Sequence, residues 1–270
     1  MKIGTLSFAK KINSFDLSPQ EKDRVIIRMI NENNPNLILC AGWSVKGFNN
    51  VEYIAKEIGK SNSNTYAVVE TQYDHLPSDV SSDRYHVVYL INPKGSVSIL
   101  GKQIFGQARN VRGKQGEACL AAFDATLDQR QGKVDNRNLI SLCCGEINIL
   151  HGRNQVHCVS EVAEDALSAA DIIVNPTHDL MGNHGTLIAK RKWISKKIGN
   201  RNRIYISCSN WDNAGYAINN NNERRKRNKQ TPRGKMIHTV FYNGIQQDMD
   251  VIHNGDGGFL YRQWDESSTQ

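Results

Sequence analysis

Apolar positions along the chain follow two periods, one typical of strands and one typical of helices. Short apolar runs predict strands at residues 2–8, 36–40, 65–69, 86–91, 96–100, 139–143, 171–174, 203–208, 237–243, 248–252 and 258–264. Helical spacing of apolar residues predicts helices at residues 19–33, 51–60, 161–170 and 186–198. Strands and helices thus alternate through most of the chain, which predicts an α/β protein.

The first helix has the clearest start signal. Ser18 is a suitable N-cap, Pro19 suits the first helical turn, and Glu21 completes a capping box. Elsewhere, turn residues at 92–95 predict a hairpin between two strands, and Asn175-Pro176 predicts a turn after the strand at 171–174.

Length and composition favour one domain. The chain has 270 residues, 39% of them hydrophobic, and no Pro/Ser/Gly-rich linker, so we expect a single domain over 1–270. It has no apolar run of membrane-spanning length and no signal peptide at its N-terminus, which favours a cytoplasmic protein without membrane contact. The six cysteines form no Cys-x-x-Cys pair, so neither disulfides nor structural zinc is expected.

The net charge of +7 is concentrated in one stretch. The stretch from Leu180 to Lys235 contains fourteen Lys and Arg residues but two acidic residues. The densest part, an insertion at about 219–235, lacks apolar periodicity and is predicted to be an exposed basic loop. It is either a solvated insertion or, through residues 223–235, a contact for an anionic substrate or partner, nucleic acid included.

Cys144 is the candidate for chemistry. It follows the apolar strand at 139–143, where a chain that turns towards a cleft would present a nucleophilic thiol. An inert core thiol is the commoner role of a free cysteine. Neighbouring Cys143 should point to the opposite face, because side chains alternate along a strand.

Several segments, in this order, resemble those of the nitrilase, or carbon-nitrogen hydrolase, superfamily: 36–48, 86–95, 113–117, 142–146, 170–176 and 204–210. The resemblance implies a four-layer α-β-β-α sandwich, paired into a homodimer or a larger homo-oligomer. It also implies that Cys144 attacks an amide, nitrile or N-carbamoyl carbon and forms a thioester. Lys102 would stabilise the developing charge, and Glu117 would be an accessory glutamate. Nothing in the sequence calls for a metal or an organic cofactor.

The chain departs from this pattern at the general base. Where the resemblance would place a Pro-Glu pair, the sequence has Ala41 and Gly42. Glycine cannot accept a proton, and loss of a positioned base costs about 10² to 10⁴ in rate. The lysine position is also open, since a small shift would place Gln103 or Gln107 there instead of Lys102.

Four residues are candidates to replace the base: Glu70, Glu117, His178 and His184. For Glu70 the simpler interpretation is a surface charge at a strand end, and for the two histidines it is a solvated loop residue. Glu146 is expected to fix the turn after the nucleophile.

Two classes of function remain open from the sequence. The first is a hydrolase of a non-peptide C-N bond that acts on a small molecule through Cys144. The second is a catalytically degenerate relative that binds an anionic ligand, nucleic acid or protein partner. Lys102 and Glu117 favour the first, and Gly42 favours the second.

Overall fold

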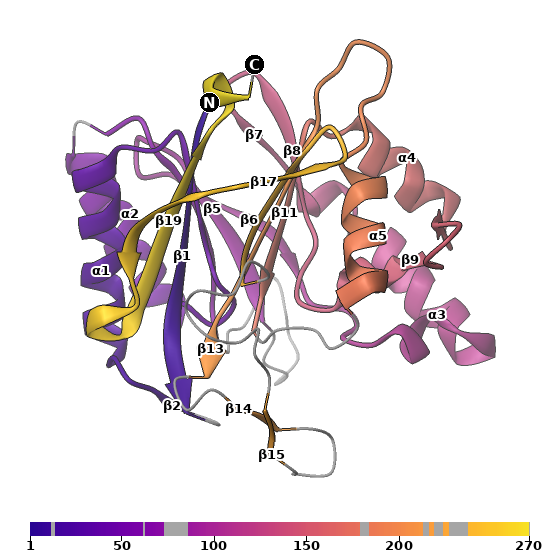
Figure 1. Ribbon diagram of the computed structural model, residues 1–270, viewed down its shortest axis with the longest axis horizontal. Helices are drawn as coiled ribbons and strands as arrows, with labels where there is room; N and C mark the ends of the chain where they lie inside the picture. The colour runs from indigo at the N-terminus through magenta and orange to yellow at the C-terminus, as the bar shows by residue number, and fades with distance from the viewer. Residues whose placement is uncertain are drawn as a thin grey trace.

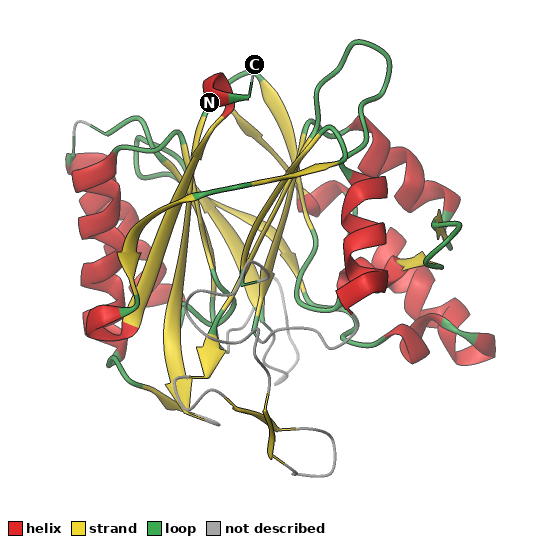
Figure 2. Cartoon of the chain, viewed as in Figure 1, coloured by secondary structure: helices red, strands yellow, loops and turns green. Residues whose placement is uncertain are grey.

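The computed structural model describes residues 1–11, 14–61, 63–72, 86–178, 184–212, 216–218, 224–226 and 237–269. Two β-sheets lie face to face at the centre, and helices cover the outer face of each (Figures 1 and 2).

The first sheet contains both early and late strands of the chain. Its order is β18 (Asp250–Asn254), β19 (Phe259–Asp265), β1 (Lys2–Lys11), β3 (Leu37–Cys40), β4 (Tyr66–Glu70), β5 (Val87–Ile91) and β6 (Val97–Lys102). Two short strands, β2 (Ser14–Phe15) and β13 (Trp211–Asp212), pair with the end of β1. β1, β3 and β4 are parallel, as expected for strands connected through helices.

The second sheet has the order β17 (Ile245–Gln247), β16 (His238–Tyr242), β12 (Ile204–Ser209), β11 (Ile172–Thr177), β8 (Arg137–Ser141) and β7 (Gln131–Val134). β8, β11 and β12 are parallel at its centre. Their carboxyl ends therefore meet at one edge of the sheet, where ligand sites of parallel sheets usually lie.

Five α-helices of the described residues form the outer layers. α1 (Pro19–Asn33) and α2 (Phe48–Lys60) cover the first sheet, and α3 (Gly113–Asp124), α4 (Glu161–Ala169) and α5 (His184–Ile194) cover the second (Figure 1). Side chains alternate accordingly: Ile38 packs in the core against α1 and α2, whereas Leu39 packs between the sheets. Ile173 packs against the outer helices of the second sheet, and Val174 packs between the sheets. The predicted four-layer α-β-β-α sandwich is confirmed.

Short elements complete the described chain. They are β9 (Leu150–His151), β10 (His157–Cys158), β14 (Tyr216–Ile218), β15 (Arg224–Lys226) and the 3₁₀ helices η1 (Ala108–Val111), η2 (Asp128–Arg130), η3 (Glu146–Ile149), η4 (Asp256–Gly258) and η5 (Glu266–Ser268). Of the predicted basic loop, only residues 224–226 are described, as the strand β15 paired with β14. The rest of 219–235 lies outside the described residues. No described helix is both long and apolar enough to cross a membrane.

The predicted first helix is confirmed, including the capping box between Ser18 and Glu21. The predicted turn at Asn175-Pro176 is wrong, because both residues continue β11 and pair with β12. Proline is tolerated there because the ladder between β11 and β8 ends at Val174, so no neighbour on that side needs an N–H donor. The helix α3 and the strands β7 and β17 were not predicted.

Candidate functional site

Cys144 lies in a tight turn, three residues after β8 ends at Ser141. Cys143 is fully buried between the sheets and Cys144 is partly exposed, so the predicted division between the two cysteines is confirmed. Gly145 has φ +81°, and a Cβ there would collide with the carbonyl oxygen of Gly106. Only glycine satisfies both conditions, so the residue after Cys144 is dictated by the backbone of the turn.

A buried ion pair fixes this turn. Glu146 and Arg130 are both fully buried, with Oε2 of Glu146 2.6 Å from Nη1 of Arg130. The Glu146 carboxylate also accepts from the backbone N–H of Cys143 (2.7 Å) and of Ile104 (2.7 Å). Arg130 in turn donates to the carbonyl of Lys102 (2.7 Å). The predicted structural role of Glu146 is confirmed, and the pair ties the nucleophile turn to the chain after β6.

The second support comes from β11. Asn175 donates to the carbonyls of Leu142 (2.8 Å) and Cys143 (3.0 Å). Its own side-chain oxygen accepts from the hydroxyl of Tyr205 (2.9 Å). The residue expected in a turn is thus a buried strand residue that holds the backbone leading to Cys144.

His178 lies beside Cys144, one residue beyond the end of β11. Its backbone N–H points at Sγ of Cys144 at 3.4 Å, and its ring Nε2 is 2.9 Å from Oε2 of Glu70. Because Nε2 contacts Glu70, Nδ1 is the ring nitrogen left to face the thiol. The ring also forms a side-chain hydrogen bond with Cys144, so Cys144, His178 and Glu70 form one chain of side chains across the two sheets, in the order nucleophile, imidazole, carboxylate.

The simpler interpretations of Glu70 and His178 are wrong. Glu70 ends β4 but is fully buried, because its side chain turns into the space between the sheets, and His178 is only 8% exposed. Burial alone lowers the pKa of an imidazole, but the negative charges of Glu70 and of ionised Cys144, with hydrogen bonds to both, raise the pKa of His178 to about 11. His178 is therefore an imidazolium at neutral pH.

Trp43 and His86 enclose the ring of His178. Trp43 stacks on it with ring centroids 4.0 Å apart and planes 18° apart, and its backbone N–H donates to Oε2 of Glu70 (3.2 Å). Its indole N–H lies 3.0 Å from Nδ1 of His86. Burial and the charge of His178 lower the pKa of His86, although Glu70 acts in the opposite direction. His86 therefore stays neutral beside the charged His178.

Gly42 leaves the space that His178 occupies. A Cβ at Gly42 would collide with Cδ2 of His178 and lie 2.5 Å from Oε2 of Glu70 and 2.9 Å from the backbone of Thr177. The Gly42 N–H donates to the carbonyl of Thr177 (3.0 Å), which holds the two chains at this separation. At the position where the resemblance would place the base, the backbone thus lies against an imidazole contributed by another strand.

The structure places the other predicted site residues in different surroundings. Lys102 ends β6, half-buried, and its carbonyl accepts from Arg130. The side chain of Gln103 donates to the carbonyl of Cys144, so Gln103 supports the nucleophile turn. Glu117 is exposed on α3 and takes part in none of the hydrogen bonds described around Cys144. The side chain of His184, at the start of α5, lies outside the described residues.

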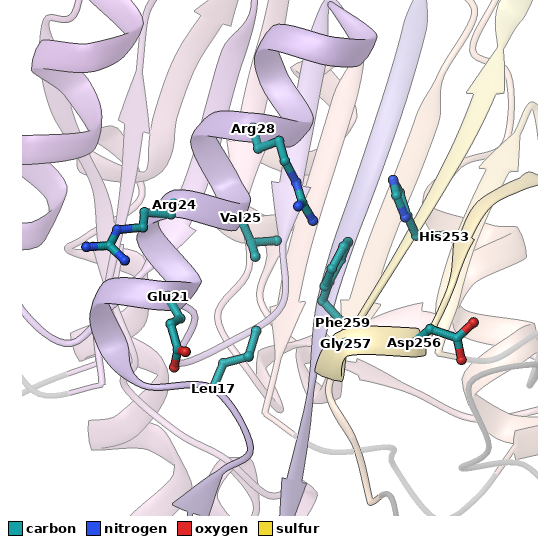
Figure 3. Close-up of a pocket in the computed structure, with 9 residues that line it drawn as sticks. All are labelled: Leu17, Glu21, Arg24, Val25, Arg28, His253, Asp256, Gly257 and Phe259. Carbon is teal, nitrogen blue, oxygen red and sulfur yellow. The ribbon is translucent and has the colours of Figure 1, made fainter.

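A pocket of about 470 Å³ lies elsewhere, between α1 and the β18–β19 edge (Figure 3). The guanidinium of Arg28 sits 5.1 Å from the ring centroid of Phe259, and His253 packs on the other side of the same ring. None of the lining residues contacts Cys144, His178 or Glu70, so this pocket is separate from the site at Cys144.

Sequence reasoning missed Arg130 as a site residue. Trp43 was expected only as the start of a pocket-lining loop over 43–50, without a specific role. Arg130 lies between predicted elements and has no neighbouring motif, so no local signal identifies it.

Comparison with known proteins bears on the fold. No protein-family profile and no curated protein sequence matches the chain. Among solved structures, an amidase from Nesterenkonia sp. is similar with a TM-score of 0.53 and 11% identity, over 100% of this chain and 93% of its own. A carbon-nitrogen hydrolase from Helicobacter pylori is similar with a TM-score of 0.54 and 10% identity, over 100% of this chain and 90% of its own.

A glutamine-dependent NAD(+) synthetase from Cytophaga hutchinsonii is similar with a TM-score of 0.54 and 10% identity; the match covers this whole chain but 43% of the synthetase. At these identities the matches carry the fold and not the activity. With the two central sheets and the outer helices described above, they show that the chain has the fold of the nitrilase, or carbon-nitrogen hydrolase, superfamily.

Proposed function

We propose that the protein hydrolyses a non-peptide C-N bond of a small amide, nitrile or N-carbamoyl compound through a thioester on Cys144. In this proposal His178 is the acid and base, and Glu70 positions its ring. The observation that carries the proposal is that the ring of His178 forms hydrogen bonds with both the thiol of Cys144 and the buried carboxylate of Glu70, while its backbone N–H points at Sγ of Cys144. A thiol, an imidazole and an orienting carboxylate form a sufficient set for acyl transfer on unrelated folds.

Acylation would begin from the thiolate-imidazolium pair. For an amide, the Cys144 thiolate forms a bond to the carbonyl carbon, and the imidazolium of His178 gives its proton to the nitrogen as the C-N bond breaks. The amine leaves and a thioester remains on Cys144. Since the negative charge of Cys144 is then gone, one cause of the high pKa of His178 is removed.

Deacylation would use the neutral imidazole that acylation leaves behind. His178 takes a proton from water, the oxygen attacks the thioester carbon, and the carboxylic acid leaves as the Cys144 thiolate is regenerated. Glu70 holds the ring through Nε2 in both steps, so it acts as a positioning residue. A glutamate at position 42 is not required by this sequence of steps.

The developing oxyanion has backbone donors nearby. The N–H groups of Cys144 and Gly145 have no acceptor within the described part of the chain, and both lie in the turn of the nucleophile. Backbone N–H groups held in such a turn are typical hydrogen-bond donors to an oxyanion. Lys102 as a charged oxyanion stabiliser and Glu117 as an accessory residue stay predictions, as do assembly into homo-oligomers and an anionic partner at 223–235.

Incubation with a panel of amides, nitriles and N-carbamoyl compounds, followed by intact-mass spectrometry and product analysis, tests the proposal. We expect a hydrolysis product, or an acyl adduct on the wild type that Cys144→Ala lacks. Fluoroacetamide belongs in the panel, because variants of the Nesterenkonia amidase take up its acetamide moiety at the active-site cysteine. Neither adduct nor product with any compound would favour the binding protein instead.

A further inference from the structure

Lys22 is a buried cation outside the set of groups that the proposed chemistry uses. It lies on α1, is 2% exposed, and donates from Nζ to the carbonyl oxygen of Trp43 (2.8 Å). The same Nζ lies 3.7 Å from the ring centroid of Phe15 and 5.6 Å from that of Phe8. Burial of a lysine costs free energy unless its charge is paired or hydrogen-bonded. The hydrogen bond from Lys22 to Trp43 therefore indicates that Lys22 has a role in holding Trp43.

The residue that Lys22 contacts is held in an unfavourable backbone conformation. Trp43 has φ +60°, in the left-handed region that non-glycine residues with large side chains seldom adopt. Several contacts hold Trp43 there; among them, its N–H donates to Glu70, its ring stacks on His178, and its carbonyl accepts from Lys22. Lys22 is therefore connected to both partners of Cys144 through one residue.

We propose that Lys22 is a positioning residue that holds the left-handed turn at Trp43 and thereby aligns His178 and Glu70 with Cys144. This inference rests on the proposed function and adds to it a residue on the outer helix layer. Lys22 touches neither Cys144 nor His178, so it acts only through Trp43.

The groups around Lys22 make this contact sensitive to pH. Burial lowers the pKa of Lys22 to about 7, against the opposing effects of Asp23 on its own helix and Cys40 on β3. β1 contributes the ring of Phe8 and β2 that of Phe15, and Nζ of Lys10 on β1 lies 5.0 Å from the ring centroid of Trp43. Asp23 itself accepts from Asn50 of α2 (2.6 Å). A charged amine donates more strongly than a neutral one, so the contact with Trp43 weakens as the pH rises through 7.

The test compares alkylation of Cys144 by fluoroacetamide in the wild type, Lys22→Met and Lys22→Gln. Lys22→Met keeps the length and removes the donor, whereas Lys22→Gln keeps a donor that does not titrate. Lys46→Met, an exposed lysine three residues after Trp43, is the matched control. At pH 6 we expect Lys22→Met to react about tenfold more slowly, the effect of one lost hydrogen bond from a charged donor, and Lys46→Met to match the wild type.

The pH profile gives a second readout that a merely structural lysine would not change. Between pH 6 and 8 the wild-type rate should fall about threefold, since a neutral donor is about half as strong, and Lys22→Gln should show no such fall. If Lys22→Met fails to fold, the pH profiles of the wild type and of Lys22→Gln still test the inference. Equal rates and equal profiles in all variants would overturn the inference. Slow labelling of Cys144 in the wild type itself would instead count against the proposed function.

Discussion

Replacing His178 by glutamine is expected to lower turnover of the substrate by about 10² to 10⁴, the usual contribution of a positioned acid or base. Glutamine can still donate a hydrogen bond to Glu70, but it can neither carry the proton to the leaving nitrogen nor take one from water. The measurement is kcat on the best compound of the panel, together with the rate at which Cys144 is alkylated. Both should fall, because the nucleophile loses the imidazolium beside it.

A matched substitution separates this effect from general damage. His157→Gln changes an exposed histidine on β10 and should leave both rates unchanged. Glu70→Gln should lie between the two, because an amide holds the ring of His178 without stabilising its charge. If His178→Gln kept turnover within a few-fold of the wild type, the base would have to be another residue, and Glu117 would return as the candidate.

The buried pair of Glu146 and Arg130 is expected to govern stability. Arg130→Met should lower the free energy of unfolding by about 3–5 kcal/mol, because it leaves the carboxylate of Glu146 uncompensated in the core. Glu146 also binds the backbone N–H groups of Cys143 and Ile104, so a displaced carboxylate would loosen the nucleophile turn as well. Denaturant unfolding at constant pH measures the change.

An exposed pair provides the control for that measurement. Lys60 and Glu57 form an ion pair of the same length, 2.6 Å, on the surface of α2. Lys60→Met should therefore cost less than about 1 kcal/mol. A loss of the same small size for Arg130→Met would show that the buried pair does not determine the stability of the turn.

Much of the fold was accessible from the sequence because its signals are local. The capping box of Ser18 and Glu21 and the apolar runs of the central strands each depend on neighbouring residues. Cys144 was identified in the same way, from the strand that leads to it. The turn at Asn175-Pro176 was mispredicted because the strand β12, whose pairing continues β11 through these residues, is distant in sequence.

The partners of Cys144 could not be ranked from the sequence. Glu70 and His178 are 108 residues apart, and the packing of the first sheet against the second brings them together. As isolated residues, a strand-end carboxylate and a loop histidine resemble ordinary surface groups. The absence of a glutamate at position 42 was visible in the sequence. That the small glycine there leaves room for the imidazole of His178 follows only from the three-dimensional contact.

The central claim is that Cys144, beside the imidazolium of His178, is the reactive nucleophile of the protein. The most direct measurement is the relative labelling of the cysteines of the wild type at pH 6, followed residue by residue with peptide mass spectrometry. Burial raises the pKa of Cys158 to about 11 and also raises that of Cys119, so both partly exposed thiols should stay protonated and react slowly. We predict that Cys144 is labelled at least about tenfold faster than either. Labelling of all three at similar rates would contradict the claim.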